Sequence, residues 1–176
     1  MRSNRSIELT PSGMLRMPTV AVHVERKTSR SQMSLPQMSL PPVLDAELVG
    51  TYPDVAKSGG GFVWDTVLEY RVWCHPERGA PDEADGSDYY YAFASYEEAA
   101  EFSATAKGAE EPLALVLQRE FIDEPEEGTY VHVREERIAE WPVEFLERPR
   151  RTERTIPDFL APDAPSNRLA ILRGKA

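Results

Sequence analysis

The stretch that decides the fold runs from Tyr89 to Ile122 and reads YYYAFASYEEAAEFSATAKGAEEPLALVLQREFI. Its start alternates large aromatic with smaller side chains, a period of two that is typical of a β-strand. Ser95 and Glu98 form an S-x-x-E capping box, and the helix that follows ends at Gly108. LALVLQREFI, from Leu113, is rich in strand formers. We therefore predict two parallel strands that a helix joins in a right-handed crossover.

A further strand precedes this unit, in the run FVWDTVLEYRVW at residues 62–73. Side chains alternate between the two faces of a strand, so the sequence can be divided into two sets. The apolar set comprises Leu68, Tyr70, Val72 and Cys74, and we expect it to face the core. The other set comprises Val67, Glu69, Arg71, Trp73 and His75. We expect this polar set to lie on an open face, which is either wet or a ligand site.

The segment FIDEPEEGTYVHV, residues 121–133, predicts a hairpin with Pro125 and Gly128 in an acidic turn. Tyr130 and His132 alternate with Val131 and Val133, so we expect one polar and one apolar face. The chain then leaves the sheet near Trp141, and Pro142 begins a short helix. IPDFLAPDAP, residues 156–165, predicts an extended proline-rich strap that covers a groove, and a short terminal helix follows it.

Together these elements predict an α+β fold, a two-layer sandwich with a roughly four-stranded mixed sheet in β-β-α-β-β order. One main helix covers the sheet, and short helices lie near the C-terminus. We expect residues 43–176 to form a single domain. Residues 1–42 contain the tandem repeat QMSLPQMSLPP and little to bury, which predicts a disordered extension. That extension is either an inert tail, an artefact of an upstream start codon, or a partner-binding arm.

The composition indicates an acidic protein of the cytoplasm. The 176 residues carry a net charge of −10, and the first 41 residues are basic, so the remainder carries −14. Such a body repels phosphate backbones, so we expect no nucleic-acid partner. No apolar run reaches the ~18 residues of a membrane span, and the start lacks the apolar core of a secretory signal. A single cysteine, Cys74, fits a reducing compartment.

The sequence contains no strong catalytic motif. Cys74 and His75 point to opposite faces of a strand, which makes them a poor dyad. The remaining candidates for acid–base chemistry are His132 and His75. The candidates for ligand binding are Glu69, Arg71, Trp73 and Tyr130.

Three other segments suggest binding sites, and for each of them we prefer another interpretation. The acidic loop at residues 77–88 lacks the ligand spacing of a calcium loop, and three histidines with one cysteine lack that of a zinc site, so we expect no metal. Gly59-Gly60-Gly61 leads into a strand, which favours a flexible or close-packing turn over a phosphate cradle. The basic run Arg148, Arg150, Arg151 and Arg154 either binds an anionic partner or, as we prefer, lies against the acidic surface of its own fold.

Four segments together resemble a family of small uncharacterised bacterial proteins. They are LVGTYPDVAKSGGGFVWD, LEYRVWCHPERGAPD, DYYYAFASYEEAAEF and EERIAEWPVEFL, within residues 48–172. Members are loosely labelled GCN5-type (GNAT-like) acetyltransferases, so the resemblance implies N-acyl transfer with acetyl-CoA as the cofactor. The R/Q-x-x-G-x-G/A motif that holds the cofactor's pyrophosphate is not found here. The helix entry Ser95-Tyr96-Glu97-Glu98 instead presents two carboxylates.

Two hypotheses follow from these observations. The first is an acetyl-CoA-dependent N-acetyltransferase-like protein, which rests on the resemblance alone. The second is a non-catalytic module that binds a small molecule or a protein through the polar sheet face or the proline strap.

Overall fold

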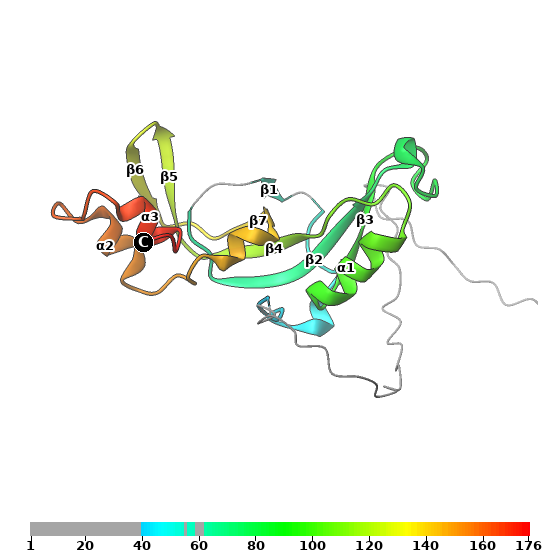
Figure 1. Cartoon of the computed structure of the whole chain (residues 1–176), viewed down its shortest axis with the longest axis horizontal. Helices are drawn as coiled ribbons and strands as arrows, with labels where there is room; N and C mark the ends of the chain where they lie inside the picture. Colours follow the sequence, from blue (N-terminus) through cyan, green and yellow to red (C-terminus); the bar gives the residue numbers. More distant parts are fainter. Residues whose placement is uncertain (1–39, 55, 59–61) are drawn as a thin grey trace, which may run out of the picture.

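The structure is a computed structural model that describes residues 40–54, 56–58 and 62–176. Nearly all of the predicted N-terminal extension, and the glycine triplet, lie outside the described residues. The fold is α+β, as predicted: a five-stranded sheet, a separate two-stranded sheet and short helices (Figure 1). The longest described helix has ten residues, and none is long and apolar enough to cross a membrane.

The large sheet has the strand order β1-β7-β4-β2-β3. Its strands are β1 (Lys57–Ser58), β2 (Thr66–Cys74), β3 (Tyr89–Phe93), β4 (Leu113–Gln118) and β7 (Arg137–Pro142). Neighbours are antiparallel except for β1, which is a short strand parallel to β7. Because β3 and β4 both run antiparallel to β2, they are parallel to each other, as predicted, with β2 between them.

Helix α1 (Tyr96–Thr105) connects β3 to β4 and packs on β2 and β3. The predicted cap is present, since Ser95 Oγ accepts a hydrogen bond from the Glu98 amide at 3.3 Å. Ala99 is the fully buried residue of the helix, and it lies in the main core with Tyr70 and Val72. The sequence therefore placed this helix correctly, and the handedness of the crossover remains a prediction.

The fourth long strand of the large sheet is β7. This corrects the prediction that a strand of the hairpin takes that place. The chain bends after Gln118, where the Arg119 amide donates to Asp65 Oδ2 at 2.7 Å instead of to a neighbouring strand. The hairpin, β5 (Phe121–Glu126) and β6 (Thr129–Val133), forms the two-stranded sheet. Pro125 lies within β5, where the pairing is irregular, and the turn itself is centred on Gly128.

A β-bulge also corrects the predicted division of the two faces of β2. The register with β4 shifts between Val67 and Glu69, so Leu68 is an extra residue. The shift brings Val67 into the core cluster that contains Tyr70 and Val72. Val67 was therefore assigned to the wrong face, because strict alternation fails at a bulge.

The C-terminal segment forms a second core with the hairpin. After the short 3-10 helix η3 (Val143–Glu147), the chain forms α2 (Thr155–Leu160) and α3 (Arg168–Leu172). The prediction of an extended strap was wrong for the first part of that segment, because α2 is helical. Pro157 falls in the first turn of α2, where no backbone donor is needed. Its role as a cover was right, since Ile156 and Phe159 are buried against Phe121 and Ile122.

Candidate functional site

The polar face of β2 is closed, which corrects the expectation that it is an open face, either wet or a ligand site. Glu69 and Arg71 are fully buried. Arg71 Nε donates to Glu69 Oε1 at 2.7 Å, and Arg71 Nη1 donates to Glu140 Oε1 at 2.9 Å. The third nitrogen, Nη2, donates to the Pro53 carbonyl at 2.8 Å. We call Glu69, Arg71 and Glu140 the closed cluster.

Residues 50–54 lie over the closed cluster and pair with it. The Gly50 amide donates to Glu69 Oε2 at 2.6 Å. Trp73 Nε1 donates to Glu140 Oε2 at 3.3 Å, and the Tyr90 ring stacks on the Arg71 guanidinium at 4.3 Å. Trp73, a predicted ligand-binding residue, therefore serves the same network as Glu69 and Arg71. Sequence reasoning missed Glu140 and the covering residues, because they come from distant parts of the chain.

Electrostatics agrees with a structural role for the closed cluster. Burial alone would lower the pKa of Arg71, but its hydrogen bond to Glu140 and the charge of Glu69 raise that pKa above its ordinary value. The guanidinium thus stays charged in the interior, where its partners compensate the loss of water. All of its nitrogens have protein partners, so this group is not free to bind a substrate anion.

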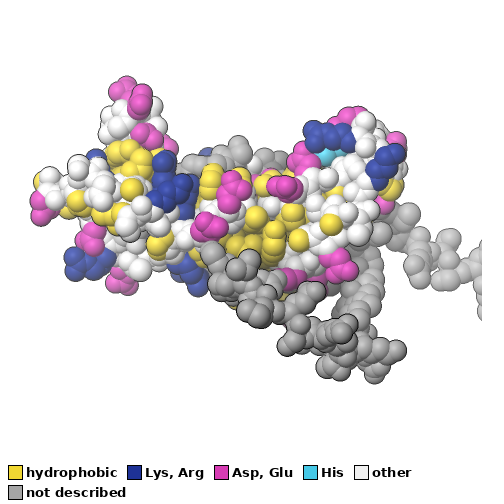
Figure 2. All heavy atoms as spheres, in the orientation of Figure 1, with side chains coloured by type: hydrophobic (Ala, Val, Ile, Leu, Met, Phe, Trp, Pro, Cys, Tyr) yellow, Lys and Arg dark blue, Asp and Glu magenta, His cyan; other side chains and the backbone are white. Residues whose placement is uncertain are grey.

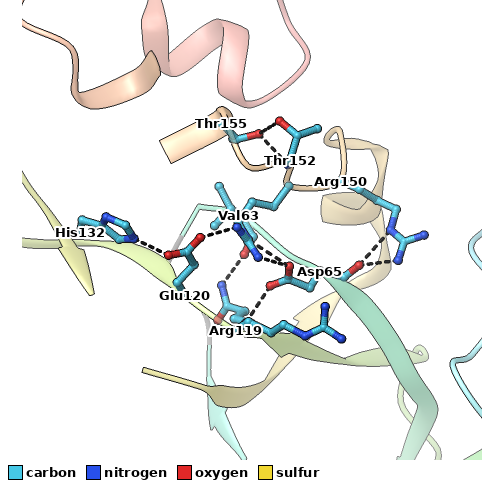
Figure 3. Close-up of polar contacts among 10 residues, drawn as sticks. Val63, Asp65, Arg119, Glu120, His132, Arg150, Thr152 and Thr155 are labelled. Carbon is cyan, nitrogen blue, oxygen red and sulfur yellow. Dashed lines mark hydrogen bonds and ion pairs between the residues drawn. The ribbon is translucent and has the colours of Figure 1, made fainter. Parts of the chain in front are cut away.

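His132 lies on β6, and its ring points to Glu120 in the bend between β4 and β5 (Figure 3). His132 Nε2 is 2.7 Å from Glu120 Oε2. The other oxygen of Glu120 pairs with Arg151, which also forms two bonds to Asp65 Oδ1, at 2.9 and 2.7 Å. We call Asp65, Glu120 and Arg151 the clasp.

The clasp ties the C-terminal segment to the large sheet. Arg150 strengthens it by donating twice to the Asp65 carbonyl, at 2.9 and 2.6 Å (Figure 3). The remaining basic residues also have partners within the fold: Arg154 pairs with Asp158, and Arg148 stacks on Phe145. The preferred interpretation, that the basic run lies against the acidic surface of its own fold, therefore holds for Arg150 and Arg151, whereas Arg154 is exposed and Arg148 contacts an aromatic ring.

Tyr130 and His132 share the hairpin but do not converge on one ligand position. The Tyr130 ring packs edge-on against Phe159, with centroids 4.9 Å apart, and belongs to the second core. His132 has the geometry of a base oriented by a carboxylate, but that carboxylate is also held by Arg151. The predicted apolar face is also wrong in part, because Val131 is 45% exposed.

His75 follows β2 and lies among carboxylates. Its Nδ1 is 2.9 Å from Asp88 Oδ1 and 3.7 Å from Glu77 Oε1, and its Nε2 is 3.0 Å from Glu110 Oε1. The residue is only 8% exposed, yet neither ring nitrogen makes a well-directed hydrogen bond. We call His75, Glu77 and Asp88 the open cluster, since Glu77 and Asp88 are exposed.

The open cluster follows from the register of the sheet, which the sequence did not reveal. Cys74 pairs with Tyr89 at the end of β2 and β3, so the next residues outward, His75 and Asp88, lie side by side. The 3-10 helix η2 (Pro76–Arg78) then brings Glu77 to the same place. A search for His and Cys spacing could not find this group, because two of its three members are carboxylates.

A hollow of about 290 Å³ lies close to the open cluster and is lined in part by the connection between β2 and β3. It is lined by Cys74, Gly79, Pro81, Tyr89, Tyr91, Phe102, Ala106 and Lys107. Burial raises the pKa of the Cys74 thiol, and the charge of Glu83 adds to the effect. A thiol that stays protonated is a weak nucleophile, which agrees with the prediction of a buried, unreactive cysteine.

Comparisons with protein-family models, with curated proteins and with solved structures found no match for this chain. The resemblance to acetyltransferases therefore remains a prediction, as does the acetyl-CoA that it implies.

Proposed function

We propose that this chain is a non-catalytic protein-binding module, and that its hairpin β5–β6 receives an extended, basic segment of a partner protein. One observation carries the proposal: the hairpin projects from the body as a two-stranded sheet (Figure 1). Among the described residues, neither of its outer edges has a neighbouring strand. Unpaired backbone donors and acceptors along an edge are what a partner strand pairs with in β-augmentation.

The charge of the hairpin favours a basic partner. The segment 121–136 carries six carboxylates against a single arginine, Arg134. The acids are Asp123, Glu124, Glu126, Glu127, Glu135 and Glu136. The tip is acidic in the space-filling view (Figure 2). Such a field attracts Lys- and Arg-rich segments and repels acidic ones, so it selects partners and speeds their encounter.

One apolar side chain interrupts this acidic surface. Val131, in the middle of β6, is 45% exposed, although its neighbours in the sequence are half-buried. An exposed β-branched residue on an edge strand offers a contact for one apolar side chain of an added strand. The partner segment that fits is therefore extended, basic and apolar at one position.

The hairpin is held rigidly enough to act as a template. Its base is anchored by Phe121, Ile122 and Val133, which pack against α2 and α3 in the second core. Tyr130 adds an aromatic contact to Phe159, and His132 is fixed by Glu120. These two candidate residues therefore have a positioning role in this proposal. Because the hairpin is already ordered, binding to it carries a smaller entropic cost.

Acyl transfer, the alternative, would need a place for the pyrophosphate of acetyl-CoA. The N-terminus of α1 is already capped by Ser95, and exposed Glu97 and Glu98 follow it. Carboxylates at that end of a helix oppose the approach of a phosphate. The charge at this helix end therefore favours the binding module over acyl transfer.

The test compares two exposed apolar residues. Partners are captured from native extract with the wild type, identified, and then titrated as purified proteins against Val131→Lys and Ile171→Lys. Ile171 is the matched control, because it is 49% exposed but lies on α3. We expect Val131→Lys to weaken binding at least tenfold and Ile171→Lys to leave it within twofold. Hydrogen exchange should show new protection of backbone amides in Thr129–Val133 of the complex.

Two results would contradict the proposal. One is equal binding by both variants, or protection that appears elsewhere in the chain. The other is a thermal shift with acetyl-CoA, because a ligand at about 100 times its dissociation constant stabilises the folded state by roughly 2.7 kcal/mol. A shift of that size would support the transferase hypothesis instead.

A further inference from the structure

We propose that the open cluster is a binding site for a divalent transition-metal ion such as Zn²⁺, which it binds more tightly than Mn²⁺. The proposed ligands are Nδ1 of His75 and one carboxylate oxygen each from Glu77 and Asp88. Their three ligand atoms lie within 4.8 Å of one another. An imidazole nitrogen combined with carboxylate oxygens is a donor set suited to Zn²⁺ and Mn²⁺, with Zn²⁺ higher in the affinity order.

The distances are compatible with a shared ion as well as with a simple ion pair. Two atoms that each bind one ion at about 2.1 Å are roughly 3.0 to 3.4 Å apart at angles between 90° and tetrahedral. The separations from His75 Nδ1 are 2.9 Å to Asp88 Oδ1 and 3.7 Å to Glu77 Oε1, which bracket that range. The exposed carboxylate side chains can rotate to close the remaining gap.

The buried ring of His75 supplies the second, independent observation. At 8% exposure it has lost its contact with water, yet neither ring nitrogen has a hydrogen-bond partner with good geometry. An unsatisfied buried polar atom destabilises the folded state, and an ion bound to Nδ1 would offset that cost. The acidic residues alone would not indicate a site, but a buried nitrogen directed at them does.

A metal-bound histidine commonly has a carboxylate beside its other ring nitrogen, and His75 has one, although the two atoms are not aligned as a good hydrogen bond. Such a histidine commonly donates its other N–H to a carboxylate, which fixes the tautomer. Here Nε2 lies 3.0 Å from Glu110 Oε1, and Arg78 Nη1 holds the same oxygen at 2.7 Å. Arg78 Nε also lies 3.5 Å from Glu77 Oε1. Arg78 therefore competes for one ligand but orients the carboxylate that would support the site.

A bound ion would join both ends of the connection between β2 and β3. His75 directly follows β2, Glu77 lies in η2, and Asp88 directly precedes β3. Because Glu77 and Asp88 are exposed, the ion would keep water in its remaining positions. The site is distinct from the hairpin proposed to bind a partner, so the two proposals can fail separately.

The test is a calorimetric titration of the chelator-treated full-length chain with ZnCl₂, repeated with MnCl₂ and MgCl₂. We expect one Zn²⁺ per chain, weaker binding of Mn²⁺ and no binding of Mg²⁺ in the same range. Asp88→Asn and Glu77→Gln should each weaken Zn²⁺ binding at least tenfold. Both residues are exposed, so these variants should fold, and thermal unfolding without metal verifies it.

Asp85→Asn is the matched control, because it removes the same charge from the same loop at an exposed position outside the cluster. It should leave Zn²⁺ binding within twofold. Glu110→Gln should weaken Zn²⁺ binding by more than Asp85→Asn but by less than Asp88→Asn, because Glu110 acts through His75 and is not itself a ligand. The proposal is overturned if no Zn²⁺ binds, or if Asp88→Asn binds as tightly as Asp85→Asn.

Discussion

Strand β2 bears two charge clusters of opposite character, the closed cluster in its middle and the open cluster at its end. In the closed cluster, Arg71 is fully buried and every nitrogen of its guanidinium has a protein partner. In the open cluster, His75 is also buried, but its ring nitrogens have no well-directed partner. Arg71 and His75 are thus similarly buried, and the two clusters differ in the exposure of their carboxylates and in how completely the buried polar atoms are paired.

The comparison shows what makes a buried charge structural. A buried ion whose partners are all internal has no capacity left for a ligand, and it fixes the elements that meet there. The closed cluster joins β2, β7 and residues 50–53. The open cluster leaves one nitrogen and two exposed carboxylates free of strong mutual bonds, so a cation can still enter. The predictions below test this distinction.

The largest effect is expected from removing the cation of the closed cluster. Arg71→Met leaves Glu69 and Glu140 without their shared partner, and an uncompensated buried charge costs about 3–5 kcal/mol. Urea denaturation should show this loss in the free energy of unfolding. Arg154→Ala is the control, since its ion pair with Asp158 is exposed, and it should leave the urea midpoint unchanged.

A triple variant sharpens the same test. Replacing the whole closed cluster with Arg71→Met, Glu69→Leu and Glu140→Met removes all of the buried charge and should recover much of the stability. If Arg71→Met alone costs less than ~1 kcal/mol, the cluster is not structural, and the closed face would again be a candidate binding surface.

An intermediate effect is expected at the clasp, which is less buried than the closed cluster. Arg151→Met removes bonds to Asp65 and Glu120, and hydrogen bonds to charged groups are worth about 1.5–3 kcal/mol. We expect a loss of that size, together with faster proteolysis of the segment after Arg151. Unchanged proteolysis would show that the second core alone holds the C-terminal segment in place.

The central unit could be predicted from sequence because its signals are local. The capping box at Ser95 and the alternation in Tyr89–Phe93 each depend on neighbouring residues, and both are present in the structure. The hairpin was found for the same reason, from turn residues between two strand-like runs. The bulge at Leu68 was not predicted, because it arises from the pairing with β4 and not from any residue in β2.

The candidate site was less predictable, since it depends on contacts between distant segments. Alternation correctly grouped Glu69, Arg71 and Trp73 on one face, but nothing in β2 shows that residues 50–54 cover them. Arg71 binds Glu140, which is 69 positions away. Similarly, His75 meets Asp88 only because Cys74 and Tyr89 end their strands in register.

The smallest effect is expected from removing a charge in the open cluster of metal-free protein. Asp88 is half-exposed and its bond to His75 is poorly directed, so Asp88→Asn should change the free energy of unfolding by less than ~1 kcal/mol. Urea denaturation in the presence of a chelator measures this. A loss as large as that of Arg71→Met would mean that both clusters are structural.

The most direct test of the distinction is a Zn²⁺ titration followed by NMR signals from both clusters in one sample. The imidazole signals of His75 report on the open cluster, and the Arg71 Nε–H and Trp73 indole N–H signals report on the closed cluster. We expect the His75 signals to shift in proportion to bound Zn²⁺, while those of Arg71 and Trp73 stay in place. Shifts confined to Arg71 and Trp73, or no shift of His75 at saturating Zn²⁺, would contradict the account.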